Sequence, residues 1–181
     1  MRRTVFAVVC GVVLLISGTA SAQVPATDAG RSLPTREGFW FNGGLGLGSY
    51  GCQDCDGERT SGLSGGLSLG GTLNEHVLLG VGTTGFAKDV DGETFTVGTF
   101  DARVRYYPSI ANGFFLNGGV GLGSMRFAGE SELGLGIMLG VGWDIRIGGK
   151  VSVTPFWNGF AMRNSNVDAN VGQLGIGITI H

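Results

Sequence analysis

Residues 39–49 read FWFNGGLGLGS, and residues 114–124 repeat the pattern as FFLNGGVGLGS. In both copies an aromatic cluster comes first, and mostly aliphatic residues then alternate with asparagine or glycine. Alternation with a period of two places unlike residues on the two faces of a β-strand. The repeat therefore predicts two β-strands, each with one aliphatic face and one face of small or polar residues.

The same alternation extends through most of the chain that follows. We expect eight strands, near residues 39–50, 62–72, 77–84, 94–107, 114–125, 133–144, 151–159 and 173–180. Phe95 and Val97 are out of phase with the rest of the fourth strand, which predicts either a bulge or two side chains that point inward. Pro155 is unusual inside a closed sheet because it has no N–H to donate.

Composition limits the class of protein. The chain has 181 residues, enough for a single domain, and 36 of them are glycine. Four prolines without a Gly-X-Y period exclude collagen, and the regular aliphatic positions argue against a disordered chain. A net charge of −2 gives no electrostatic reason to expect a nucleic-acid partner.

The first residues have the features of an export signal. Two arginines precede an uncharged run over residues 5–16, and Ala20-Ser21-Ala22 is a small-x-small cleavage site. We therefore predict a signal peptide over residues 1–22, since a membrane anchor needs a longer apolar run. Residues 23–37 predict a flexible periplasmic lead-in, and residues 38–181 form the single expected domain.

The contents of the two strand faces decide between two kinds of barrel. A soluble barrel would bury the aliphatic face and leave the glycine face in water, with few polar side chains to solvate it. The reverse arrangement puts aliphatic residues in hydrocarbon and small residues in the crowded interior of a small barrel. The sequence therefore predicts an all-β fold, an eight-stranded antiparallel up-and-down transmembrane barrel.

Aromatic residues gather at both sets of strand ends and predict two belts at the membrane interfaces. The first belt would hold Phe39, Trp40, Phe41, Tyr106, Tyr107, Phe114, Phe115 and Trp143, and the second Tyr50, Phe86, Phe95, Phe127, Trp157 and Phe160. The longer, more acidic loops share the second end. Periplasmic turns are the short ones in such barrels, so we expect the acidic loops to face the cell exterior.

Three motifs carry a family resemblance: the Asn-Gly-Gly-x-Gly-x-Gly strands, the segment RVRYYP at residues 103–108, and the alternating C-terminal strand. On these motifs residues 38–181 resemble the small outer-membrane β-barrel family of OmpA, OmpX and OmpW type. The resemblance implies a monomer in the cell outer membrane, surrounded by outer-membrane lipid and lipopolysaccharide and inserted by the barrel-assembly machinery. Family members usually end in an aromatic residue, whereas this chain ends in Ile180-His181.

Few motifs suggest chemistry. Residues 46–51 and 80–85 match the dinucleotide fingerprint, but neither opens a helix after a strand, so we expect no nucleotide or other cofactor. Cys52 and Cys55 lack the context of a redox or zinc site and predict a disulfide in the first outer loop. The acidic loop residues form either a solvated rim or a site for a divalent cation.

A polar group is expected inside the barrel. Asp101, Arg103 and Arg105 share the inward face of the fourth strand, and Asp144 and Asn42 join them from other strands. Buried charges persist only when they are paired or hydrated. The group is therefore either a structural plug, or a gate or anion-selective constriction. The remaining lumen is either filled by large side chains such as Trp40, Phe95, Met138 and Phe156 or open.

An enzyme is not expected. The two histidines, His76 and His181, fall at the periplasmic strand ends, away from the outer rim where lipid substrates would be reached. Our leading hypothesis is a non-enzymatic outer-membrane barrel with a structural or surface-interaction role. The alternative is a narrow channel for small solutes through a glycine-lined lumen.

Overall fold

The computed structural model describes residues 36–52, 59–90, 92–165 and 168–181. Its strands are β1 (Phe39–Cys52), β2 (Thr60–Asn74), β3 (Val77–Val90), β4 (Glu93–Tyr106), β5 (Phe114–Phe127), β6 (Glu130–Trp143), β7 (Ile145–Gly148), β8 (Val151–Arg163) and β9 (Asp168–Ile180). In these ranges no helix is long and apolar enough to cross a membrane. The predicted signal peptide lies outside the described residues, as does all of the predicted lead-in except Arg36 and Glu37.

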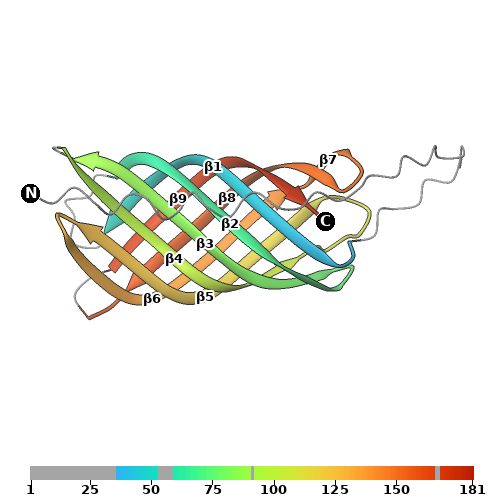
Figure 1. The fold of residues 1–181 in the computed structure, drawn as a ribbon, viewed down its shortest axis with the longest axis horizontal. Helices are drawn as coiled ribbons and strands as arrows, with labels where there is room; N and C mark the ends of the chain where they lie inside the picture. Colours follow the sequence, from blue (N-terminus) through green and yellow to red (C-terminus); the bar gives the residue numbers. More distant parts are fainter. Residues whose placement is uncertain (1–35, 53–58, 91, 166–167) are drawn as a thin grey trace, which may run out of the picture. The chain divides into compact units, whose positions relative to one another are not determined.

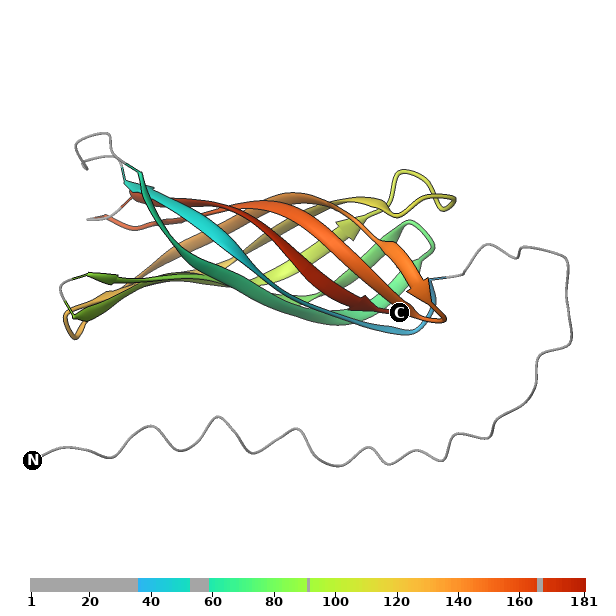
Figure 2. The same cartoon turned by 90° about the horizontal axis from the view of Figure 1, so that it is seen from above.

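The strands form one closed antiparallel ring (Figures 1 and 2). Each strand pairs with its neighbour in sequence except β6 and β7, and β9 pairs with β1 to close the barrel. β6 and β7 both pair with β8 and together occupy one strand position, so the barrel has eight strands. The fold class predicted from the sequence is confirmed. We call the end with the turns near Asn74, Ser109 and Gly149 the turn end, and the opposite end the loop end.

The break between β6 and β7 explains the proline inside the sheet. Pro155 is in register with Ile176 of β9. On its other side, the β6–β8 pairing stops at Gly142, opposite Phe156, and pairing resumes only at Ile145 of β7, opposite Val153. The missing N–H of Pro155 thus falls where no ladder hydrogen bond is made, which is how a strand tolerates proline.

The charged segments at residues 88–93 and 126–131, which the sequence predicts as loops between strands, form shorter loops than expected. Val90 pairs with Glu93, and Phe127 pairs with Glu130, so most residues assigned to loops 88–93 and 126–131 belong to strands. In the second hairpin Ala128 and Gly129 have φ angles of 49° and 86°. Positive φ at both central residues is the type I′ geometry that matches strand twist. The charged residues suggested loops, but the strands extend through them to the hairpin tips.

The outward face is an apolar band. Leu47 on β1 is 74% exposed, Leu139 on β6 is 65% exposed, and Leu174 on β9 is 67% exposed. Aliphatic residues are similarly exposed on the other strands. Soluble proteins rarely expose a continuous apolar surface of this extent, so the band is the surface that contacts hydrocarbon.

The inward face is lined by glycines that lie opposite one another on neighbouring strands. Examples are Gly46 with Gly175 and Gly70 with Gly80. A Cβ added to Gly70 would collide with the carbonyl oxygen of Leu79. The strands therefore approach too closely on the concave side for side chains at these positions, which is why this small barrel needs glycine there.

The aromatic belts predicted from the sequence are partly wrong. Trp40, Tyr107 and Phe115 at the turn end are at most 1% exposed, and Phe86 and Phe160 at the loop end are 2% exposed. These rings lie inside the barrel because each is separated by an even number of positions from the inward-facing residues of its own strand. Other predicted members do face outward, for example Phe39, Phe41, Tyr106, Trp143 and Trp157, whereas Phe127 packs against the inward Phe95 at the loop end.

The change of phase in the fourth strand has a simple explanation. β4 pairs with β3 and β5 without a register shift, so no bulge is present. Val97 is 1% exposed, and Phe95 packs against the same buried group of side chains. Both residues point inward, the second of the two possibilities that the sequence left open.

Candidate functional site

The lumen is filled at the turn end by a packed cluster. The turn-end cluster consists of Trp40, Leu78, Tyr107 and Phe115. The guanidinium carbon of Arg105 lies 4.1 Å from the centre of the Phe115 ring and 4.9 Å from that of Trp40. A cation over ring faces is stabilised without a hydrogen bond to every N–H, and Nη1 of Arg105 has no hydrogen-bond partner among the residues that the structure describes. The cluster closes this end with aromatic rings around a buried charge.

The middle of the lumen holds an ion pair. Nε and Nη2 of Arg103 each donate a hydrogen bond of 2.8 Å to a different carboxylate oxygen of Asp101. Thr84 and Thr99 complete the group by bonding to Arg103 and Asp101, respectively. A Cβ on Gly82 or Gly119 would collide with these side chains, so glycine provides the room for the pair.

A second polar network lies at the turn end, around Asp144. Its carboxylate accepts hydrogen bonds from the Tyr107 hydroxyl at 2.6 Å and the Thr154 hydroxyl at 2.7 Å, and Nε2 of His181 lies 3.3 Å away. Thr154 bonds to Thr179 at 2.8 Å, and the Asn42 amide donates to the same Thr179 hydroxyl at 2.8 Å. The network thus joins β1, β8 and β9 to the break between β6 and β7.

The structure separates the five residues that the sequence grouped together. Asp101 and Arg103 form the central pair, Asp144 and Asn42 belong to the turn-end network, and Arg105 bonds to Asn117 at 3.1 Å. All five face the lumen, yet the described hydrogen bonds do not unite them into one site. Strand parity gave the direction of each side chain, whereas the partners depend on how strands align.

Sequence reasoning missed Tyr107, Thr154 and His181 as parts of the network. Tyr107 follows Asp101, Arg103 and Arg105 at the same two-residue spacing, so parity alone could have placed it inside. His181 likewise continues the inward series of β9 after Thr179. Both were instead assigned to the periplasmic surface because they lie at strand ends.

The loop end of the lumen is closed by a second cluster. The loop-end cluster consists of Phe86, Val97, Met138, Phe160 and Val171, with exposures of 2% or less. Tyr50, Phe95 and Met125 pack against it. Ser64 on β2 donates a hydrogen bond of 2.5 Å to Gln173 on β9, so the bond spans β1, which lies between these two strands. Side chains therefore fill both ends of the barrel.

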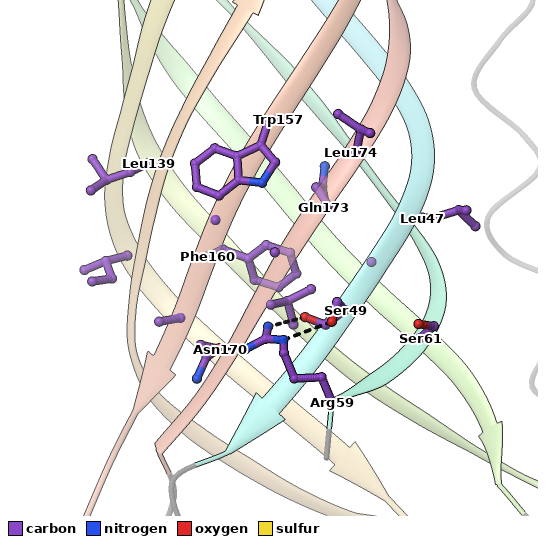
Figure 3. A pocket seen from close by; sticks show the side chains of 16 residues that line it. Leu47, Ser49, Arg59, Ser61, Leu139, Trp157, Phe160, Asn170, Gln173 and Leu174 are labelled. Atoms are coloured by element: carbon purple, nitrogen blue, oxygen red, sulfur yellow. Dashed lines mark hydrogen bonds between the residues drawn. The ribbon is translucent and has the colours of Figure 1, made fainter. Parts of the chain in front are cut away.

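A recess interrupts the outward face near the loop end (Figure 3). It has a volume of about 700 Å³ and lies over β1, β9 and β8. We call it the outer recess. Its floor is made of small outward residues and its rim of large ones, and Arg59 lies across its loop-end side. Those lining it from outside include Leu47, Ser49, Arg59, Ser61, Leu139, Trp157, Gly159, Asn170, Gly172 and Leu174.

The cysteine and acidic-loop predictions are not tested. Cys52 ends β1, but Cys55 lies outside the described residues, so the disulfide stays a prediction. Asp54, Asp56, Glu58 and Asp91 also lie outside them. Within the described part of the chain, no group of three or more His, Cys, Asp and Glu residues could hold a metal ion.

A closed antiparallel barrel with an apolar exterior and a packed interior defines an integral membrane barrel of the small bacterial type. The model of the outer membrane protein β-barrel domain family matches residues 10–179. The chain belongs to this family, whose members reside in the outer membrane. The family assignment made from the sequence motifs is confirmed.

Solved structures with the same fold support this assignment. Neisserial surface protein A (NspA) is 16% identical, with a TM-score of 0.58 over 78% of this chain and 96% of that one. Ail, the attachment invasion locus protein of Yersinia pestis, is 13% identical, with a TM-score of 0.58 over 80% of this chain and 99% of that one. These likenesses establish the fold. No curated protein matches the chain.

Proposed function

We propose that this protein is a non-enzymatic outer-membrane barrel with a closed lumen and a structural or surface-interaction role. The observation that carries the proposal is the packing of the lumen. The turn-end cluster, the Asp101–Arg103 pair and the loop-end cluster lie one after another along the barrel, and their side chains are at most 5% exposed. A solute would have to displace all three.

The glycine lining does not amount to an open path. A Cβ on Gly44 would lie 2.6 Å from the Phe156 ring, and one on Gly48 would lie 2.6 Å from the Phe86 ring. Large side chains from other strands therefore occupy the space that glycine leaves. Arg103 is bound on two sides by Asp101 and Thr84, so its guanidinium is not free to line a passage for anions. These contacts favour the plug over the channel.

The positions of the described histidines argue against catalysis. His181 is 6% exposed and lies beside Asp144 at the turn end of the lumen, where the hydrogen-bond network encloses it. His76 lies in the β2–β3 turn, where Nδ1 is 2.7 Å from the carbonyl oxygen of Tyr107. A general base must reach the proton that it removes from a substrate, and neither histidine lies at the loop end.

The loop end supports a role in surface contacts. Its hairpins carry exposed charged residues, including Asp89, Glu93, Arg126, Glu130 and Arg163. Two barrels with the same fold are named as a surface protein and an attachment protein. We propose that the hairpins, at the cell exterior, are the part of this protein that meets external partners.

Conductance in planar lipid bilayers tests the closed lumen. We expect the purified wild-type protein to give no unitary current steps. Reducing all three barriers, with Trp40→Ala, Arg103→Ala and Phe160→Ala in one chain, should produce steps because it removes large side chains along the whole lumen. Reproducible wild-type steps that Arg103→Ala alters would overturn the proposal and establish the channel.

A further inference from the structure

The outer recess lies where the apolar band gives way to polar hairpins. Its floor is a row of small residues in register across three strands, namely Ser49, Gly172 and Gly159. The next row toward the turn end is large, namely Leu47, Leu174 and Trp157. The surface therefore drops just before the loop end, at the depth where lipid chains meet their headgroups.

The floor is open toward the membrane. A Cβ on Gly172 would meet no atom within 4 Å, in contrast to the inward glycines. Neighbouring strands are about 4.8 Å apart, so a floor crossing β1, β9 and β8 is about 10 Å wide. That width has room for more than one hydrocarbon chain. Trp157, which is 50% exposed, borders the recess with its large ring (Figure 3).

Arg59 places a positive charge at the loop-end side of the recess. Its Nε donates to the Ser49 hydroxyl at 2.9 Å, and its Nη1 donates to the Asn170 side-chain oxygen at 2.8 Å. Nη2 donates to the Ser49 carbonyl oxygen. These partners are all neutral, so they orient the guanidinium without cancelling its charge. An exposed, oriented guanidinium is well suited to binding a phosphate group.

A second recess on the same band has no arginine over its floor, and Arg126 lies one row beyond it toward the loop end, opposite Thr96. It lies over β2, β3, β4 and β5, has a volume of about 620 Å³, and is lined on the outside by small residues such as Gly85, Gly98 and Ser124. No arginine is among its lining residues. The two recesses offer similar space to hydrocarbon, so the guanidinium distinguishes the outer recess as a candidate for a charged lipid.

We propose that the outer recess binds lipid A of lipopolysaccharide, with a phosphate on Arg59 above Ser49 and acyl chains beside it over Gly172 and Gly159. A wide floor suits a lipid with several acyl chains, and the negative phosphates of lipid A complement the positive charge of Arg59. The inference goes beyond the proposed function and holds whether the lumen is closed or open. It uses the expectation that the loop end faces the exterior, where lipopolysaccharide forms the leaflet.

Native mass spectrometry of the folded protein in detergent, titrated with bisphosphorylated lipid A, tests the proposal. Arg59→Ala should weaken binding about tenfold or more, because it removes a charge-assisted contact to phosphate. Arg59→Lys should retain part of the affinity. Gly172→Leu should also weaken binding, since it fills the floor without a clash.

Gly85→Leu is the matched control, because it fills the second recess at a similarly open position, where a Cβ would meet only the Val97 carbonyl oxygen at 3.9 Å, and it should leave binding unchanged. Equal binding by the wild type and Arg59→Ala would overturn the proposal. Displacement of lipid A by an equal concentration of phosphatidylglycerol would also overturn it, since the site would then belong to phospholipid. Bilayer conductance is independent of these results, so the two proposals fail separately.

Discussion

At the scale of single residues, the Asp101–Arg103 pair is the most sensitive point of the lumen. Both side chains are buried, and each neutralises the other. Arg103→Ala should lower the free energy of unfolding by about 3–5 kcal/mol, because it leaves a buried carboxylate without its partner. Urea unfolding in lipid vesicles, followed by tryptophan fluorescence, measures the change.

The double variant Asp101→Ser/Arg103→Met is the control for this prediction. It removes both charges together and should cost much less than Arg103→Ala alone. A double variant as unstable as the single one would show that the pair matters through packing and not through charge.

Ala128 is a residue that does not suit its backbone. Its φ of 49° lies in the left-handed region, which is unfavourable for alanine and well tolerated by asparagine. Asn-Gly is also the preferred pair for a type I′ turn. Ala128→Asn should therefore raise the free energy of unfolding by about 1 kcal/mol in the same urea assay. Ala128→Val should act in the opposite direction, and a gain in stability with valine would contradict the turn geometry.

At the scale of the strands, the two faces of β2 differ in their tolerance of a methyl group. Gly70 faces inward, and its Cβ would collide with the backbone of β3, whereas a Cβ on Gly71 would meet no atom within 4 Å. Gly70→Ala should cost about 1–3 kcal/mol through overpacking, and Gly71→Ala should stay within about 0.5 kcal/mol of the wild type. Equal effects at these adjacent positions would mean that the strands do not approach as described.

The strands also show what a single sequence reveals. Period-two alternation was enough to predict eight strands, their order and the direction of side chains such as Asp101 and Arg103, and it left the direction of Val97 open. It was not enough to predict partners. Asp144 meets Thr154 and His181 because three strand ends align at the same height. The alternation within one strand does not determine its register with the next strand. The recess under Arg59 likewise requires Ser49, Gly172 and Gly159 to lie in one row.

At the scale of the whole molecule, the loss of stability caused by an outward charge depends on its depth in the membrane. Val120 lies near the middle of β5 and is 56% exposed, while Ser124 lies on the same face closer to the loop end. Val120→Arg should lower the free energy of unfolding in vesicles by about 2–4 kcal/mol, and Ser124→Arg by about 0–1 kcal/mol. Similar losses at both sites would contradict the position of the apolar band.

The whole barrel also explains why the aromatic belts were partly mispredicted. Position along a strand suggested that Trp40, Tyr107 and Phe115 lie at the membrane interface. Parity along the strand decides between lipid and lumen, and it places these rings inside. A barrel this small has room to bury them only because the opposing positions are glycine, a balance of volumes that no local pattern reveals.

The turn-end network has a consequence for the order of assembly. Asn42 on β1 and Thr179 on β9 belong to the first and last strands, and their bond crosses the seam that closes the ring. In an open sheet Thr154 on β8 and His181 after β9 still lie beside Asp144, but Thr179 lacks the amide of Asn42. The last pairing step therefore completes the hydrogen bonding of a threonine hydroxyl in this network as well as a ladder. Because ladder bonds and side-chain bonds between β1 and β9 form together, we expect closure to be cooperative and a half-closed barrel to have little stability.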